Sequence, residues 1–235
     1  MSEAKRKPRW SRRIVNLLAT VFLAVAAIVI AYRFVPPPAT ILMVSRAPVD
    51  GIDYRWRSLN DISPNLVRAA IAAEDARFCL HKGFDVEAIQ KAMEHNERVE
   101  ARGRGRMRGA STITQQTAKN VFLWSGRDWI RKGLETAFTP VIEVAWGKRR
   151  IMEMYLNVAE FGPGVYGAEA GARHWFGKSA RELTPREAAR MAAILPSPRR
   201  YSAGSPGPYV RRRASRIQAA MGTVRQSGLD DCVTR

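Results

Sequence analysis

The apolar and polar positions divide the chain into one continuous hydrophobic run and a longer body of amphipathic segments. Residues 14–32 read IVNLLATVFLAVAAIVIAY, in which Asn16 and Thr20 are the clearly polar side chains. At about 1.5 Å per residue, a helix of this length spans close to the ~30 Å hydrocarbon core of a bilayer. Beyond residue 41, apolar residues recur largely at helical spacing. The pattern therefore predicts a membrane-spanning helix followed by a mainly α body.

Local start signals mark individual helices of the body. Ser63 and Pro64 place an N-cap before a proline in the first turn, and an Ala-rich helical stretch follows them. Asp85 precedes a predicted helix at residues 86–102, whose apolar residues recur at helical spacing, and Thr184 forms a capping box with Glu187. The other predicted helices are one capped by Ser111 or Thr112, residues 127–145, residues 148–158 beyond Gly147, and residues 209–225.

Alternating strand patterns are scarce in this sequence. The best candidate is ATILMVS at residues 39–45. We therefore expect a mainly α fold with at most a small β element. Residues 98–109, RVEARGRGRMRG, combine glycines with arginines, so we expect a mobile basic loop there.

The distribution of basic residues predicts how the apolar run is oriented in the membrane. Six basic residues precede it, whereas Arg33 and Arg46 are the only basic residues in the twenty positions after Tyr32. The positive-inside rule then leaves the N-terminus in the cytoplasm and the body outside it. A cleaved secretory signal is the alternative, because residues 24–26, AVA, resemble a cleavage site; the apolar run continues beyond them and favours a retained anchor. The expected organisation is a basic cytoplasmic tail at 1–13, an anchor at 14–35, a linker at 36–50, a domain at 51–225 and a C-terminal tail at 226–235.

The formal net charge of +18 indicates a polyanionic partner: nucleic acid, an anionic membrane surface or a phosphorylated substrate. The two cysteines, Cys79 and Cys232, lie too far apart in sequence for a metal knuckle, and the three histidines form no ligand pattern. A disulfide outside the cytoplasm is one alternative, but we favour Cys79 as a small buried hydrophobic residue. We therefore expect no metal site built from protein ligands alone.

Four segments combine residue types suited to acid–base and phosphate chemistry. Glu74 and Asp75 end an otherwise apolar helix; since helical neighbours point about 100° apart, one can face a cleft while the other anchors the turn. Residues 109–120, GASTITQQTAKN, offer hydroxyl and amide donors at a helix start, and Lys119 lies one turn beyond Gln115. The remaining two are residues 131–135, RKGLE, in which two cations precede a carboxylate, and residues 150–157, RIMEMYLN.

These segments resemble the motifs of the family 51 glycosyltransferases, the peptidoglycan polymerases. The motifs are EDxxFxxHxG at residues 74–83, GxSTITQQxxKN at 109–120, RKxxE at 131–135, RIxExYLN at 150–157, and a closing motif that begins at His174. The resemblance covers about residues 55–200, and its motifs are long, ordered and specific. It implies a lysozyme-like helical glycosyltransferase domain in the periplasm, attached to the inner membrane by a single span. Because no KTG signature occurs and the single SxxK match, residues 2–5, lies before the apolar run, we expect a monofunctional polymerase without transpeptidase activity.

The resemblance also implies a reaction and roles for individual residues. The family transfers a growing glycan chain from undecaprenyl pyrophosphate to the 4-hydroxyl of lipid II, with inversion of the anomeric centre. By resemblance, Glu74 is the catalytic base, and Glu135 is a second catalytic glutamate that orients groups at the pyrophosphate or helps to bind a divalent ion. The implied substrate-binding residues are Ser111, Thr112, Gln115, Gln116, Lys119, Asn120, Arg131 and Lys132. No cofactor is expected to bind tightly, but Mg²⁺ or Mn²⁺ can accompany the substrate pyrophosphate.

The expected partners are lipid II, the lipid-linked glycan chain, the inner membrane and cell-wall synthesis or division proteins, but not nucleic acid. Three rival functions remain: a lysozyme-like lytic enzyme that acts on finished glycan, a basic protein that binds nucleic acid through residues 98–109, and an inactive scaffold within a cell-wall complex.

Simpler interpretations of single residues also stand. Glu135 and Arg131 can form an ordinary ion pair four residues apart, and Lys119 and Lys132 can be solvated surface residues. Three further residues are expected to support the fold rather than react: His81, Glu153 and Asn157.

Overall fold

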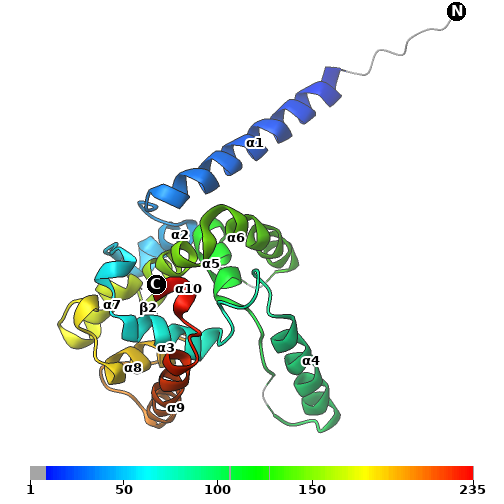
Figure 1. The fold of residues 1–235 in the computed structure, drawn as a ribbon. Coiled ribbons are helices and arrows are strands. Elements are labelled where there is room, and N and C mark those ends of the chain that lie inside the picture. The colour runs from blue at the N-terminus through cyan, green and yellow to red at the C-terminus, as the bar shows by residue number, and fades with distance from the viewer. Residues whose placement is uncertain (1–8, 106, 127, 235) are drawn as a thin grey trace, which may run out of the picture. The chain divides into compact units, whose positions relative to one another are not determined.

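The structure, a computed structural model, describes residues 9–105, 107–126 and 128–234 (Figure 1). The chain forms two compact units, Met1–Pro37 and Pro38–Arg235. In the first unit, helix α1 runs from Arg9 to Phe34. Within the described residues, its segment Arg12–Phe34 is the one helix that is long and apolar enough to cross a membrane. This segment contains the hydrophobic run that the sequence predicts as a membrane-spanning helix.

The second unit is mainly helical with a small sheet, as the sequence predicts. Its helices are α2 (Ile41–Asp50), α3 (Pro64–Glu74), α4 (Val86–Ala101), α5 (Ile113–Phe122), α6 (Trp129–Val158), α7 (Gly167–Phe176), α8 (Pro185–Ile194), α9 (Pro208–Gln226) and α10 (Asp231–Thr234), with 3-10 turns at Leu59–Asp61 and Ala180–Glu182. The strands are β1 (Asp53–Tyr54), β2 (Glu160–Gly162) and β3 (Val165–Tyr166). The sheet order is β1-β3-β2, with β1 parallel and β2 antiparallel to β3.

The predicted helix caps are confirmed. The side chains of Ser63, Asp85 and Thr184 each accept a hydrogen bond from a backbone N–H of the first turn of α3, α4 and α8. Thr112, not Ser111, caps α5. These caps satisfy N–H groups that have no partner inside a helix, so they set where each helix begins.

Gly147 divides the long helix α6 as the sequence predicts. Its φ of 72° and ψ of 167° are not helical, and its φ lies in the region that favours glycine. The predicted segments 127–145 and 148–158 therefore form one element with a kink between them. Residue 127 itself lies outside the described residues, and the helix begins at Trp129.

The strand predicted at residues 39–45 is wrong, because this stretch begins helix α2. The Thr40 side chain accepts a hydrogen bond from the Met43 N–H, and Leu42 and Met43 are buried. A cap together with tertiary burial outweighs the short alternating pattern. Helix α2 packs against α5, so residues 38–50, which we expected to be a linker, belong to the second compact unit.

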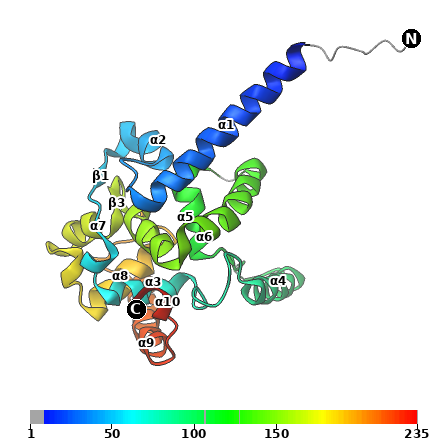
Figure 2. The same cartoon turned by 45° about the horizontal axis from the view of Figure 1, so that its top comes forward.

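Helix α3 lies at the centre of the second unit. It packs against α8 and α9, while α5 packs against α6. Its buried face is formed by Leu66, Val67, Ala69, Ala70 and Ile71. Helix α4, in contrast, extends away from the rest of this unit in both views (Figure 1, Figure 2). Residues 98–101, where the predicted helix and the predicted basic loop overlap, form the last turn of α4, and the Asn96 side chain hydrogen-bonds the backbone of Arg108.

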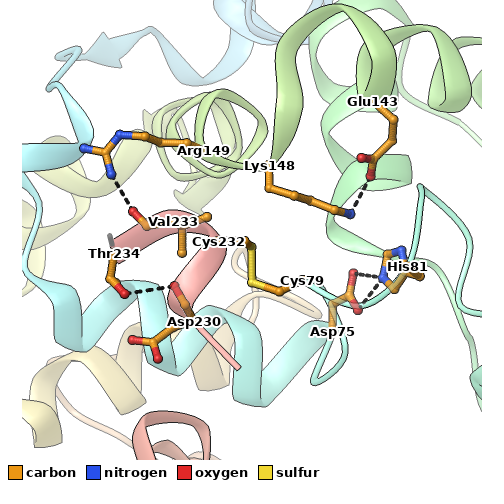
Figure 3. Close-up of a disulfide and its surroundings, with 10 residues drawn as sticks. All are labelled: Asp75, Cys79, His81, Glu143, Lys148, Arg149, Asp230, Cys232, Val233 and Thr234. Atoms are coloured by element: carbon orange, nitrogen blue, oxygen red, sulfur yellow. Dashed lines mark hydrogen bonds and ion pairs between the residues drawn. A yellow bond between two sulfur atoms is a disulfide. The ribbon is translucent and has the colours of Figure 1, made fainter. Parts of the chain in front are cut away.

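A disulfide joins Cys79 to Cys232, across a sequence separation of 153 residues (Figure 3). The preference for Cys79 as an unpaired hydrophobic residue is therefore wrong. The bond connects the turn after α3 to α10, within the stretch that we expected to be a C-terminal tail. There Val233 is buried, Arg149 donates to the Val233 carbonyl oxygen, and Arg68 pairs with Asp230 at 2.8 Å. The chain end is thus docked onto the domain.

Candidate active site

The end of helix α3 turns Glu74 and Asp75 in different directions, as the sequence predicts. The Asp75 carboxylate accepts a hydrogen bond from the Ile113 N–H at 3.0 Å and contacts His81 Nε2 at 2.9 Å. Asp75 is buried, so these contacts tie the turn after α3 to the start of α5. His81 acts here as a structural partner, which confirms its expected supporting role.

Glu74 faces polar groups from two other helices. Gln116 Nε2 on α5 donates to Oε2 at 3.0 Å, and Arg213 Nη2 on α9 lies 3.1 Å from Oε1. The Glu74 side chain is 13% exposed. Burial raises its pKa; the Gln116 hydrogen bond and the charges of Arg213 and Lys119 oppose this rise without cancelling it. Glu74 is therefore a more basic carboxylate than one on an open surface.

The start of α5 contains four of the predicted substrate-binding residues. Thr112 and Gln115 form a reciprocal capping box, and Thr112 Oγ1 also donates to the Gly83 carbonyl oxygen at 2.6 Å. Both side chains are buried, so they hold the helix start. Ser111 is exposed, whereas Gln116 is half-buried beside Glu74.

The first turns of α6 carry a cluster of two cations and a carboxylate. Arg131 Nη1 lies 3.0 Å from Glu135 Oε2, and Lys132 pairs with the other oxygen of Glu135. Lys132 Nζ also lies 3.5 Å from Ser111 Oγ, which connects the cluster to the start of α5. The ion pair between Arg131 and Glu135 is therefore confirmed, and it is buried rather than solvated. Lys132 is partly exposed, with 41% of its side chain accessible.

Lys119 lies between these groups without a close partner. It forms no hydrogen bond or ion pair with any residue in the described part of the chain. Burial lowers its pKa, while Glu135 raises it and the neighbouring cations lower it further. Lys119 is half-buried, so the interpretation as a solvated surface lysine is wrong. A desolvated ammonium group with three unused donors is suited to bind a phosphate.

Adjoining hollows bring the predicted residues together. One hollow of about 340 Å³ is lined by Ser111, Gln116, Lys119, Arg131, Lys132 and Glu135. A second, of about 290 Å³, contains Glu74 and Asp75 and also reaches Ser111. A third, of about 420 Å³, contains Gln116, Lys119, Asn120, Trp124 and Tyr155. The two glutamates therefore lie in neighbouring hollows that share Ser111, and Gln116 joins them by its hydrogen bond to Glu74.

The acidic side chains do not fit a divalent ion held by the protein alone. Each carboxylate already has partners: Arg131 and Lys132 for Glu135, Gln116 and Arg213 for Glu74. Within the described residues, no group of three or more His, Cys, Asp or Glu side chains could hold a metal ion. An ion at this site would have to be held mainly by substrate oxygens.

The fourth motif supports the fold, as expected. Asn157 Oδ1 accepts from the Arg57 N–H, and its Nδ2 donates to the Arg57 carbonyl oxygen, both at 2.8 Å. Glu153 pairs with Arg150. The Asn157 contacts link α6 to the segment before α3, whereas the Glu153 pair lies within α6.

Arg213 is a site residue that the sequence reasoning missed. We expected a basic helix there but assigned it no role in the site. A signal was present, because Arg213 directly precedes Ala214 on the buried stripe of α9, whereas Arg212 and Arg216 are exposed. Arg213 also lies three residues after Val210 and four before Ile217, a spacing that places it on the packed face of the helix.

This fold and site define a helical domain with a largely buried glutamate beside a cationic hollow. The model of the transglycosylase family matches residues 44–222, and the chain belongs to this family. The chain is 56% identical to the biosynthetic peptidoglycan transglycosylase of Caulobacter vibrioides, over 96% of this chain and 99% of that protein. It is 50% identical to the protein of the same name from Rhodospirillum centenum, over 96% of both chains. It is also 50% identical to the one from Pseudomonas aeruginosa, over 95% of this chain and 96% of that protein.

Proposed function

We propose that this chain is a peptidoglycan glycosyltransferase that polymerises lipid II into glycan strands. In this reaction the growing chain moves from undecaprenyl pyrophosphate to the 4-hydroxyl of lipid II, with inversion of the anomeric centre. Membership of the transglycosylase family supports the class of reaction. The observation that carries the proposal is that a buried glutamate adjoins a cationic hollow, with Ser111 common to both and Gln116 bonded to Glu74.

Glu74 is the proposed general base. A sugar hydroxyl is a weak nucleophile, so a carboxylate takes its proton as the oxygen attacks the anomeric carbon. The proton moves to Glu74, a C–O bond forms at that carbon, and the bond to the pyrophosphate breaks with its electron pair. The raised pKa of Glu74, caused by burial, strengthens it as a base. Each of its oxygens accepts one hydrogen bond and keeps another lone pair for the hydroxyl.

Cations are proposed to stabilise the leaving pyrophosphate, whose negative charge grows during transfer. Lys119 is the principal candidate, because its ammonium group has no close partner in the described part of the chain and lines two hollows. Arg131 and Lys132 are held in the hollow by Glu135, which gives Glu135 an ordering role. Ser111, Gln116 and Asn120 are the polar groups proposed to meet phosphate or sugar, while Thr112 and Gln115 fix the helix that carries them.

We infer that the domain works outside the cytoplasm, at the outer face of the inner membrane. The apolar helix is consistent with a single-pass anchor, and the basic residues before it favour a cytoplasmic N-terminus. The Cys79–Cys232 disulfide supports the same orientation independently, since structural disulfides persist in oxidising compartments. Lipid II, the lipid-linked glycan and the membrane are then its partners, together with other cell-wall synthesis or division proteins.

Incubation of the purified full-length protein with lipid II tests the proposal. We expect growth of glycan strands and release of undecaprenyl pyrophosphate. Finished glycan strands are the control substrate; their breakdown, without growth from lipid II, would identify a lytic enzyme instead.

A reporter enzyme fused after Arg235 tests the orientation separately. We expect reporter activity in the periplasm. Activity in the cytoplasm would contradict the orientation and would revive nucleic-acid binding through residues 98–109.

A further inference from the structure

Arg213 brings a positive charge to the candidate base from outside the resembling motifs, which end near residue 200. Its Nη2 lies 3.1 Å from Glu74 Oε1 and 3.4 Å from the Ala73 carbonyl oxygen. Among the described residues, it is the one basic side chain that forms an ion pair with Glu74. A contact at this distance affects both the orientation and the charge of the carboxylate.

The packing of α9 fixes where the guanidinium group lies. The helix packs against α3 and α8 through Val210, Ala214, Ile217, Met221 and Val224. Arg213 stands beside this stripe, its side chain is 27% exposed, and its Nε is buried without a partner among the described residues. The stem of the side chain therefore runs through the contact between α9 and α3, which leaves the guanidinium little freedom to move away.

The Glu74 carboxylate is consequently held from two sides. Arg213 binds Oε1, and Gln116 binds Oε2. These two contacts define the plane of the carboxylate and so the direction of its free lone pairs. We propose that Arg213 is a positioning residue for this reaction: its guanidinium aims the Glu74 carboxylate and holds it in the charged form that accepts a proton. This inference rests on the proposed function of the site.

Other charged groups near Glu74 do not replace Arg213. Asp75 is on the same turn and disfavours the negative charge of Glu74, and Lys119 on α5 favours it from a longer distance. Tyr155 on α6 is buried, and burial and the nearby carboxylates raise its pKa well above the ordinary value, so it stays neutral. Across the hollow, the charged side chains are Arg77, Asp85, Glu87, Lys91 and Arg108. Of these, Glu87 pairs with both Arg77 and Lys91, so their charges largely offset one another.

A purely structural role for Arg213 is the competing explanation. Its contact with the Ala73 carbonyl oxygen could serve only to join α9 to the end of α3. Loss of either role would lower stability, so stability cannot distinguish them. The pH dependence can, because only a residue that acts on Glu74 changes the pH at which the base loses its proton.

The experiment compares the full-length wild type with Arg213→Gln, Arg213→Lys and Arg216→Gln in lipid II polymerisation between about pH 5 and 9. Removing the positive charge lets burial raise the pKa of Glu74 further, so the acidic limb of the kcat/KM profile should move up by about one pH unit in Arg213→Gln. Its kcat should fall by about 10- to 100-fold, with KM within about threefold of wild type. Arg213→Lys keeps the positive charge, so its acidic limb should lie at the same pH as that of the wild type. It should also retain part of the wild-type kcat. Arg216→Gln removes an exposed charge from the same helix and should behave as wild type.

Thermal unfolding of each variant separates misfolding from chemistry. If Arg213→Gln is too unstable to assay, Arg213→Met keeps the packed stem, removes the charge and must show the same shift of the acidic limb. The role of Arg213 is overturned if the acidic limb of the kcat/KM profile of either neutral variant lies at the wild-type pH and its kcat falls only in proportion to the folded fraction. That failure differs from failure of the proposed function, in which the wild type itself does not extend glycan from lipid II.

Discussion

Glu74 and Glu135 lie beside adjoining hollows, Glu74 largely buried and Glu135 fully buried, but their partners differ. Glu74 accepts one hydrogen bond from the neutral amide of Gln116 and one from Arg213. Glu135 pairs with two cations, Arg131 and Lys132, and its side chain is only 4% exposed. The Glu74 carboxylate thus has one neutral and one positive partner, whereas the Glu135 carboxylate is balanced by two cations. Under the proposed function, it is this difference in charge partners that separates the base from the glutamate that orders cations.

Glu74→Gln should give the largest loss, because it removes the base and preserves the shape of the side chain. A general base contributes about 10²- to 10⁴-fold, so we expect kcat to fall by about 10³-fold. Lipid II binding should stay within about threefold of wild type. Initial rates and equilibrium binding measure the two effects. Glu97→Gln, which changes an exposed glutamate on α4, is the matched control. Loss of binding together with activity would give Glu74 a structural role.

Glu135→Gln should act through the cations rather than through the proton. It leaves buried Arg131 without its countercharge, so the free energy of unfolding should fall by about 3 kcal/mol. Disordered cations stabilise the leaving group less well, and kcat/KM should fall by about 10- to 100-fold. The acidic limb of the pH profile should not move, since Glu74 is intact. A shifted limb with unchanged stability would reverse the roles of the two glutamates.

Lys119→Ala should weaken binding of the leaving group, because the substitution removes an ammonium group that has no other close partner in the described structure. A hydrogen bond between charged groups contributes about 1.5–3 kcal/mol, so affinity for undecaprenyl pyrophosphate should fall by about tenfold or more. A displacement titration measures this affinity. Lys82→Ala, at an exposed lysine, should bind as wild type. Equal affinity in all three proteins would remove Lys119 from the site.

Replacing both cysteines, as Cys79→Ser with Cys232→Ser, should have the smallest effect on catalysis. The disulfide is joined to the turn that follows Glu74 and not to the Glu135 cluster. Its loss should lower the free energy of unfolding by about 2–5 kcal/mol and Tm by roughly 5–15 °C. Activity at 25 °C should remain within about threefold of wild type, since the Glu74 contacts survive. Wild type treated with reductant should melt like the double variant; an unchanged melting curve would show that the bond does not form.

Helix starts were predictable from sequence because their causes are local. Ser63, Asp85 and Thr184 each bond a backbone N–H two or three residues away, so neighbouring letters suffice to identify them. The break at Gly147 is local in the same sense, since a glycine allows its positive φ. The motif residues around Glu74 and Glu135 were found because they form ordered patterns along the chain.

The features that the sequence analysis missed or predicted wrongly depend on contacts between residues far apart in the sequence. Residues 39–45 alternate like a strand, but burial of Leu42 and Met43 beside α5 favours a helix. Pairing of Cys79 with Cys232 depends on where α10 docks, and the contact of Arg213 with Glu74 depends on how α9 crosses α3. Such contacts follow from tertiary packing, which periodicity within one segment does not specify.

The disulfide also turns most of the polypeptide into a covalent ring that closes across 153 residues. The exposed stretch around Gly103 lies inside this ring. A protease that cuts the backbone there opens the ring without separating its parts, so the nicked molecule would still run as one band on a gel until it is reduced. In an oxidising compartment, the protein can therefore lose a peptide bond in the segment after α4 and still keep both fragments joined.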